Sequence, residues 1–221
     1  MFAVIFDVQP KREYFDEYLR LAKYLKPELE KIDGFIDNER FGSKRKDGRV
    51  LSLSTWRDEK AVIRWRTLGV HHEVQEKGRS EVFEDYHLRV GEIIADTHVP
   101  EGQTLEEQRF DKAMVGEGKV ATISELSPLS SEKTASTDLA RDLDLPKVGT
   151  KGVIGEEVFE SIYNPGKLLL LTSWQDAAAA NKWTPTILPP NTLRHRKVRI
   201  IRDYGMRDRR EAPQYYPPAQ R

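Results

Sequence analysis

The sequence predicts an α+β protein of two tandem ferredoxin-like units, whose sheets pack together as a pseudo-dimeric α+β barrel. The chain repeats itself at a spacing of 118 residues, so that Trp56 and Trp65 are matched by Trp174 and Trp183. Each repeat also shows the element order βαββαβ, which defines a ferredoxin-like unit. A length of 221 residues suits two domains of about 100 residues each.

The repeat runs without a gap from Ala3 to Trp65, too far for chance to explain. Identical residues meet at many positions, among them Ala3 and Ala121, Ile5 and Ile123, Gly34 and Gly152, Phe41 and Phe159, and Leu53 and Leu171. A ferredoxin-like sheet carries its helices on one face, so the other face needs a partner. We therefore expect the two sheets to face each other within the chain.

The first half of the first repeat predicts a strand, a helix and a hairpin. Residues 2–8 are a short β-rich run, and Pro10 then opens a helical stretch that ends at Asp33-Gly34. Its apolar residues recur every three or four positions: Phe15, Leu19, Ala22, Leu25, Leu29 and Ile32. Residues 35–41 and 49–56 are predicted strands, and Lys46-Asp47-Gly48 is the hairpin signal between them.

The second half of this repeat predicts helical segments and a last strand. Asp58 is a predicted N-cap, followed by Ala61, Val62 and Trp65 on one helical face. A further helical piece from 70 to 77 stops at Gly78. Residues 86–94 alternate between apolar and polar side chains, as a half-buried strand does.

The second repeat is shorter than the first. After Trp183 it carries Thr-Pro-Thr-Ile-Leu-Pro-Pro where the first repeat is helical, and two adjacent prolines cannot continue a helix. We expect a first domain at 1–96, a linker at 97–118, a second domain with a shortened second helix at 119–205, and a loose or surface-bound tail at 206–221. The fuller first domain is expected to hold the larger pocket.

The composition narrows the class of partner. Thirty-six basic residues balance 36 acidic residues, so no overall field favours nucleic acid or an anionic membrane. The chain has no cysteine, which excludes disulfides and thiolate sites and fits a reducing compartment. The apolar run at the N-terminus is too short for a signal peptide, and no stretch is long enough for a membrane span. We expect a cytoplasmic protein with a small-molecule substrate.

The first repeat carries short runs along its strands and second helix that form one pattern: Gly34-Phe35-Ile36, Glu39-Arg40-Phe41, residues 51–59, Trp65-Arg66 and Gly78-Arg79. This pattern resembles the antibiotic biosynthesis monooxygenase family, and residues 201–206 resemble the end of single-domain members. The resemblance implies a dimeric α+β barrel, here formed within one chain, to which further copies of the chain could add.

The same resemblance implies candidate chemistries. Members include cofactor-independent oxygenases of electron-rich phenols and haem-degrading enzymes. The haem-degrading signature has an Asn on the first strand and a His ten residues after the helix Trp, whereas this chain has Asp7 and Gln75 there. The quinone-forming signature has an Asn four residues before the Trp and a Tyr six residues after it, where this chain has Ala61 and His71. No cofactor is expected, and haem is the alternative.

The candidate site residues follow the second predicted helix. Trp65 would form a pocket wall, His71 or His72 would act as a base that titrates near neutral pH, and Gln75, Arg66 and Arg79 would orient the substrate. The alternative is a purely structural role for these residues, with the tryptophan in the core and the histidines and arginines exposed to solvent. No group of His, Asp or Glu has metal-ligand spacing. The leading hypothesis is a monooxygenase-like enzyme acting on an aromatic or enolisable substrate, and the rival is a non-catalytic ligand- or haem-binding protein.

Overall fold

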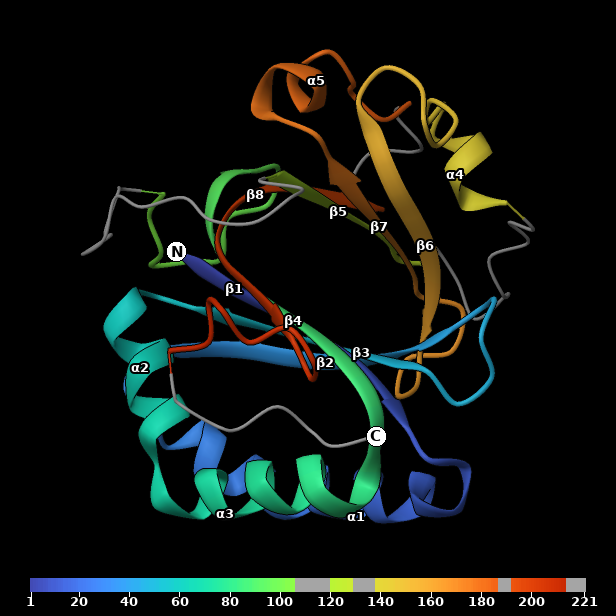
Figure 1. Cartoon of the computed structure of the whole chain (residues 1–221). Helices are drawn as coiled ribbons and strands as arrows, with labels where there is room; N and C mark the ends of the chain where they lie inside the picture. The colour runs from blue at the N-terminus through green and yellow to red at the C-terminus, as the bar shows by residue number, and fades with distance from the viewer. Residues whose placement is uncertain (106–119, 129–137, 187–191, 214–221) are drawn as a thin grey trace.

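Eight strands form a closed antiparallel barrel in the computed structural model, which describes residues 1–105, 120–128, 138–186 and 192–213 (Figure 1). The order around the barrel is β1-β3-β2-β6-β7-β5-β8-β4. The strands are β1 (Phe2–Pro10), β2 (Phe35–Ser43), β3 (Val50–Trp56), β4 (Phe83–Asp96), β5 (Val120–Leu126), β6 (Val153–Ser161), β7 (Leu168–Trp174) and β8 (Leu193–Gly205). The α+β class and the barrel are thus as predicted.

Two seams join the strands of the first half to those of the second. At one seam β2 pairs with β6 only over residues 41–43 and 159–161. At the other, β4 pairs with β8 over residues 87–96 and 196–205, with two irregularities. The sheet faces are therefore not merely stacked, because hydrogen bonds along both seams close them into one barrel.

The barrel interior is an apolar core drawn from every strand. Several of its residues are matched pairs of the sequence repeat, such as Ala3 with Ala121, Ile5 with Ile123 and Phe41 with Phe159, and all six are fully buried. Because strand side chains alternate between the two faces, residues two apart reach the same interior. Part of the repeat in the sequence is therefore a repeat of this inner lining.

The helices cover the outside of the barrel at two opposite ends (Figure 1). The first half supplies the 3-10 turn Arg12–Tyr14, α1 (Phe15–Glu30), α2 (Glu59–Thr67), α3 (Gly69–Lys77) and the π-helical turn Gly78–Val82. The second half supplies the short helices α4 (Leu139–Asp142) and α5 (Ala177–Asn181). The Asp58 carboxylate accepts a hydrogen bond from the Ala61 N–H at 2.8 Å, which confirms the predicted N-cap.

Gly34 and Gly152, which occupy matched positions of the repeat, show why both repeats have small residues where a helix approaches a strand. Gly34 and Gly152 have φ angles of +91° and +83°, in the left-handed region that disfavours residues with a Cβ. A Cβ on Gly34 would lie 2.8 Å from the Cβ of Ala61, and one on Gly152 would lie 2.4 Å from the Cβ of Ala179. Each glycine thus lets a helix approach the start of its neighbouring strand.

The predicted linker and tail are partly ordered against the barrel. Leu105, within the predicted linker, packs on the barrel core, and residues 106–118 lie outside the described residues. Met206 is buried, and its N–H donates to the Tyr86 carbonyl at 3.1 Å. The segment 206–213 therefore lies on the first half instead of being loose, and residues 214–221 lie outside the described residues.

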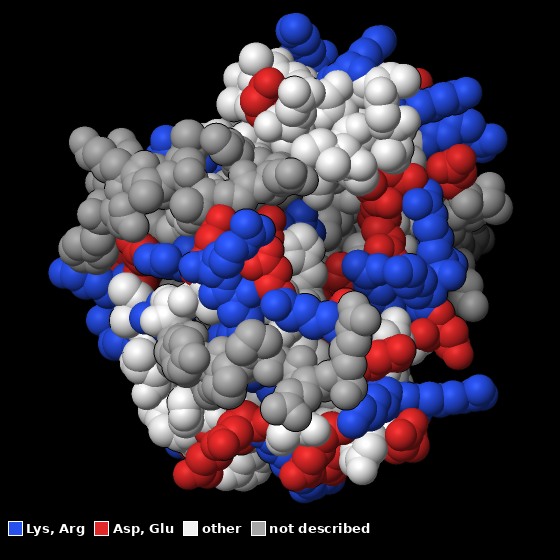
Figure 2. All heavy atoms as spheres, viewed as in Figure 1, with Lys and Arg blue, Asp and Glu red and all other residues white. Residues whose placement is uncertain are grey.

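On the face seen in Figure 2, acidic and basic side chains are intermixed, in keeping with the balanced charge of the chain. None of the helices in the described ranges combines the length and the apolar character needed to cross a bilayer.

Candidate active site

A cavity of about 190 Å³ lies between the outer face of the first-half strands and the helices that cover them. Its walls are mostly apolar side chains of β1, β4, α1 and α2, including Val4, Leu25, Val62 and Leu88. Five of the six predicted site residues line it: Trp65, Arg66, His71, Gln75 and Arg79. His72 does not line it and is exposed. Of the two adjacent histidines, His71 is therefore the one placed at the cavity.

Trp65, His71 and Gln75 form one corner of this cavity. The rings of Trp65 and His71 are stacked, with centroids 4.0 Å apart and planes 16° from parallel. The chain breaks its helical conformation at Leu68, between α2 and α3, which brings His71 back over the end of α2. There His71 Nδ1 lies 2.9 Å from the Trp65 carbonyl oxygen.

This hydrogen bond sets the tautomer of the imidazole. A carbonyl oxygen only accepts, so His71 Nδ1 carries the proton and Nε2 is the acceptor of the neutral ring. The side-chain amide nitrogen of Gln75 lies 3.4 Å from Nε2 and one helical turn away along α3. The corner therefore presents an oriented, neutral imidazole beside an amide.

Burial lowers the pKa of His71 to about 4, and the hydrogen bond to Trp65 offsets only part of that fall. The expectation of a histidine that titrates near neutral pH is therefore wrong for His71. Removing the ring from water penalises the imidazolium, so the neutral form prevails at pH 7. His71 can still accept a hydrogen bond or a proton at Nε2, as a weaker base than a solvated histidine.

The polar wall of the cavity is cationic. Its lining includes Lys26, Arg40, Arg66, Arg79 and Arg209 and, among the described residues, neither Asp nor Glu. At one point Arg79 Nη1 donates to the Tyr86 hydroxyl at 2.7 Å, and Arg209 donates to the same oxygen. Burial lowers the pKa of Arg66. A cavity with this lining favours a ligand that carries negative charge.

Several further residues of this cavity escaped sequence reasoning, among them Tyr18, Tyr204 and Arg209. Tyr18 was detectable, since it stands three, seven and eleven residues before Leu21, Leu25 and Leu29 on the buried face of α1. Tyr204 and Arg209 come from the far end of the chain, and no local pattern connects them to the first half. Burial raises the pKa of Tyr204 to about 12, so its phenol stays protonated.

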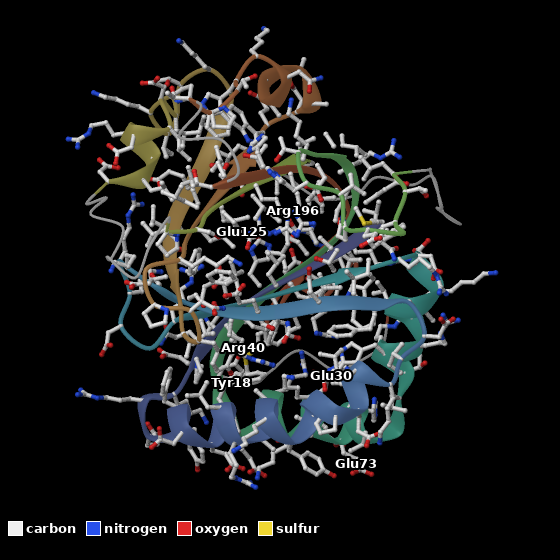
Figure 3. The ribbon with its side chains drawn as sticks, turned by 180° about the vertical axis from the view of Figure 1, so that it is seen from behind. Tyr18, Glu30, Arg40, Glu73, Glu125 and Arg196 are labelled. Atoms are coloured by element: carbon white, nitrogen blue, oxygen red, sulfur yellow. The ribbon has the colours of Figure 1, made fainter. Side chains whose placement is uncertain are left out.

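A second cavity, of about 200 Å³, is lined by charged and amide side chains near the short β2–β6 seam. There Glu125 accepts from Arg196 and lies 2.7 Å from Lys167 Nζ, and Lys167 also pairs with Glu39. Figure 3 shows Glu125 and Arg196 inside the barrel. These opposite charges neutralise each other, so the cavity does not select one sign of ligand. The described residues hold no cluster of three or more His, Asp or Glu that could bind a metal ion.

Comparison with known proteins identifies the family of the chain. The sequence model described as antibiotic biosynthesis monooxygenase matches residues 1–77, which include Trp65, His71 and Gln75. A protein of Pyricularia oryzae named jasmonate monooxygenase ABM is 42% identical over 224 residues, covering 99% of this chain and all of the relative.

One solved structure shares the fold over most of the chain. The crystal structure of an aldoxime dehydratase in complex with butyraldoxime aligns with a TM-score of 0.53 at 12% identity, over 90% of this chain and 79% of the other. A crystal structure named antibiotic biosynthesis monooxygenase covers 41% of this chain and 95% of its own, with a TM-score of 0.37 and 17% identity. With a relative 42% identical along its whole length, the chain belongs to the antibiotic biosynthesis monooxygenase family.

Proposed function

We propose that the protein is a monooxygenase that oxidises a small, largely apolar molecule in the first-half cavity. The observation that carries the proposal is the corner of Trp65, His71 and Gln75 on the wall of a cavity whose remaining lining is mainly apolar with several cationic side chains. Family membership supports the reaction type. The substrate named for the Pyricularia oryzae relative, jasmonate, is the first compound to test.

An aromatic or enolisable substrate suits this corner. His71 Nε2 accepts the proton of a phenol or enol, and the stacked Trp65 ring holds the imidazole in place. The resulting anion is electron-rich and gives its electrons to dioxygen. Conversion of a CH₂ group and O₂ to a carbonyl and water balances without an external reductant. On this reaction the enzyme needs no organic cofactor, as the resemblance to cofactor-independent oxygenases implies.

Oxygen consumption tests the proposal. Purified protein is mixed with jasmonate, or with an electron-rich phenol, and dioxygen uptake and product mass are followed. His71→Ala should lower turnover by about 10²–10⁴-fold, the usual worth of general acid–base catalysis. His72→Ala is the matched control, because His72 is its exposed neighbour, and should keep the wild-type rate.

Two results would contradict the proposal. Equal rates in the wild type and in His71→Ala, with both folded by thermal melting, would remove the base from the mechanism. A preparation with a Soret absorbance band and no oxygen uptake would favour the rival, a haem-binding protein without oxygenase activity.

We also infer that residues 1–96 and 119–205 are two ferredoxin-like units and that the chain is a monomer imitating a dimer. Support comes from the repeated interior residues and from the two seams between the halves. Analytical ultracentrifugation should give the mass of one chain, 25.5 kDa. A higher oligomer that keeps the barrel within each chain would revise the assembly but not the pairing of the units.

A further inference from the structure

We propose that Arg40 and Tyr18 bind the carboxylate of the substrate, so that the preferred substrates of the first-half cavity are apolar carboxylic acids. The inference rests on the proposed function in so far as this cavity is taken as the substrate site. It deepens that proposal by naming a substrate class and the residues that select it.

Arg40 and Tyr18 approach the cavity from opposite walls. Arg40 lies on β2 and Tyr18 on α1, and Figure 3 shows both side chains in the space between that strand and that helix. Both residues line the cavity. The Arg40 carbonyl accepts from the Ile162 N–H at 2.9 Å, just beyond the β2–β6 seam, which fixes the backbone behind the guanidinium.

Both residues present buried polar atoms to this space. The Tyr18 side chain is only 5% exposed. Its hydroxyl oxygen lies next to the Arg40 guanidinium without a hydrogen bond of good geometry, and neither this oxygen nor Arg40 Nε, both buried, has another hydrogen-bond partner among the described residues. Burial raises the pKa of Tyr18, and the nearby positive charge of Arg40 offsets part of that rise. Tyr18 therefore remains a neutral donor next to a cation.

A buried polar atom without a partner costs free energy, which a ligand can recover by bonding to it. The atoms at Arg40 and Tyr18 are donors, and the cavity lining contributes no Asp or Glu among the described residues. A guanidinium also presents two parallel N–H groups that match the two oxygens of a carboxylate. A carboxylate thus fits both the charge and the geometry of this pair.

Three of the other four cations of the cavity make hydrogen bonds or ion pairs with described residues, and the fourth, Arg66, also interacts with a neighbouring group. Arg79 and Arg209 donate to the Tyr86 hydroxyl, and Lys26 pairs with Glu30 on the surface of α1. By contrast, no described carboxylate lies within ion-pair distance of the Arg40 guanidinium. Most of the rest of the wall is aliphatic and aromatic, which suits the hydrocarbon part of an apolar acid.

The test compares an acid with its neutral ester. Binding of jasmonate, methyl jasmonate and a series of simple apolar acids, each with its methyl ester, is measured by calorimetry on wild type, Arg40→Met, Arg40→Lys, Tyr18→Phe and Arg79→Met. Wild type should bind each acid at least 10-fold more tightly than its ester. Arg40→Met should lose about 10- to 100-fold for the acids and less than 2-fold for the esters.

The conservative variants sharpen the assignment. Arg40→Lys should retain part of the preference, because it keeps the charge but not the paired N–H groups. Tyr18→Phe should lose several-fold for the acids only. A wild-type preference that survives in Arg40→Met and is abolished in Arg79→Met would overturn the assignment. So would failure of wild type to bind any of the acids. Thermal melting shows whether each variant is folded.

Oxygen uptake, measured in parallel, separates this inference from the proposed function. If no compound is oxidised while acid binding depends on Arg40, the carboxylate site stands and the monooxygenase proposal falls. If acid and ester are oxidised equally well by wild type and Arg40→Met, the monooxygenase proposal stands and the carboxylate site falls.

Discussion

Trp65 and Trp183 occupy matched positions of the sequence repeat and have opposite surroundings. Trp65 is partly buried, lines a cavity and stacks on His71. Trp183 is 5% exposed and packs against Trp174 and His195, with ring centroids 5.6 and 5.4 Å away. Its indole N–H also donates to the Leu143 and Asp144 carbonyls. Trp65 therefore borders a cavity, whereas Trp183 fills the equivalent space in the second half.

The helices around each tryptophan explain the difference. In the first half α2 and α3 have nine residues each and continue past Trp65. They form a helical layer that is separated from the barrel strands by the cavity. In the second half α5 has five residues and ends at Asn181, two residues before Trp183. The ring then turns inward to the strands. The same side chain thus serves as wall or as core according to the length of the helix that carries it.

The largest expected effect is on stability, at Trp183. Trp183→Ala should lower the free energy of unfolding by about 3–5 kcal/mol, because it empties a filled core position. Trp65→Ala should cost clearly less, because its ring already faces open space, but should weaken substrate binding. Urea denaturation of both variants measures the contrast. Equal losses would show that the two positions are packed alike.

The next effect concerns acid stability, since the histidine beside Trp183 is buried and the one beside Trp65 is partly buried. The pKa values of both His71 and His195 are lowered to about 4, mainly by burial. Their folded-state pKa lies below the unfolded value of 6.5, so the unfolded chain takes up protons first as pH falls. Stability is therefore fully present above pH 6.5 and is lost between about 6.5 and 4.

This acid sensitivity can be assigned to each histidine by substitution. For His195, which is 8% exposed, linkage gives a loss of about 2 kcal/mol by pH 4.5. His195→Gln and His71→Gln should each flatten the fall of unfolding free energy with pH, measured by urea denaturation from pH 7.5 to 4.5. An unchanged slope in either variant would mean that its histidine titrates normally.

The smallest effect is at the two matched helix caps. Asp58 accepts from the Ala61 N–H and Asp176 from the Ala179 N–H, at 2.8 and 2.7 Å. Replacing either by Ala should cost about 1 kcal/mol. Asp58→Ala should cost somewhat more, since Arg57 Nε also donates to this carboxylate at 2.8 Å. Asn at either position is the control that keeps the cap, and thermal melting ranks the four variants.

Local patterns in the sequence predicted most elements of the first half. The cap at Asp58, the hairpin at Gly48 with its φ of +73°, and the strands on either side of it follow from nearest neighbours along the chain. The repeat also predicted two units whose sheets face each other, and identical residues such as Ile5 and Ile123 do share one core. Each of these predictions depends either on short-range periodicity or on residues matched by the sequence repeat.

The rest of the site depends on contacts that no local pattern encodes. Arg209 reaches Tyr86 across 123 positions of sequence, so its role required the strand order of the closed barrel. The pKa of His71 depends on its burial, which results from the break between α2 and α3 at Leu68. Neither the helix pattern nor the residue type predicts this burial. Spacing placed His71 near Trp65, but not the stacking of their rings.

Both seams of the barrel join segments of a single chain, so the two halves are encoded by separate codons. In a symmetric dimer, every substitution appears twice, once on each side of the axis. A change that fills one cavity would then fill the other. Here Trp183 can close its side of the barrel while Trp65 keeps the opposite side open. Joining the halves in one polypeptide lets one side keep a cavity while the other side is packed.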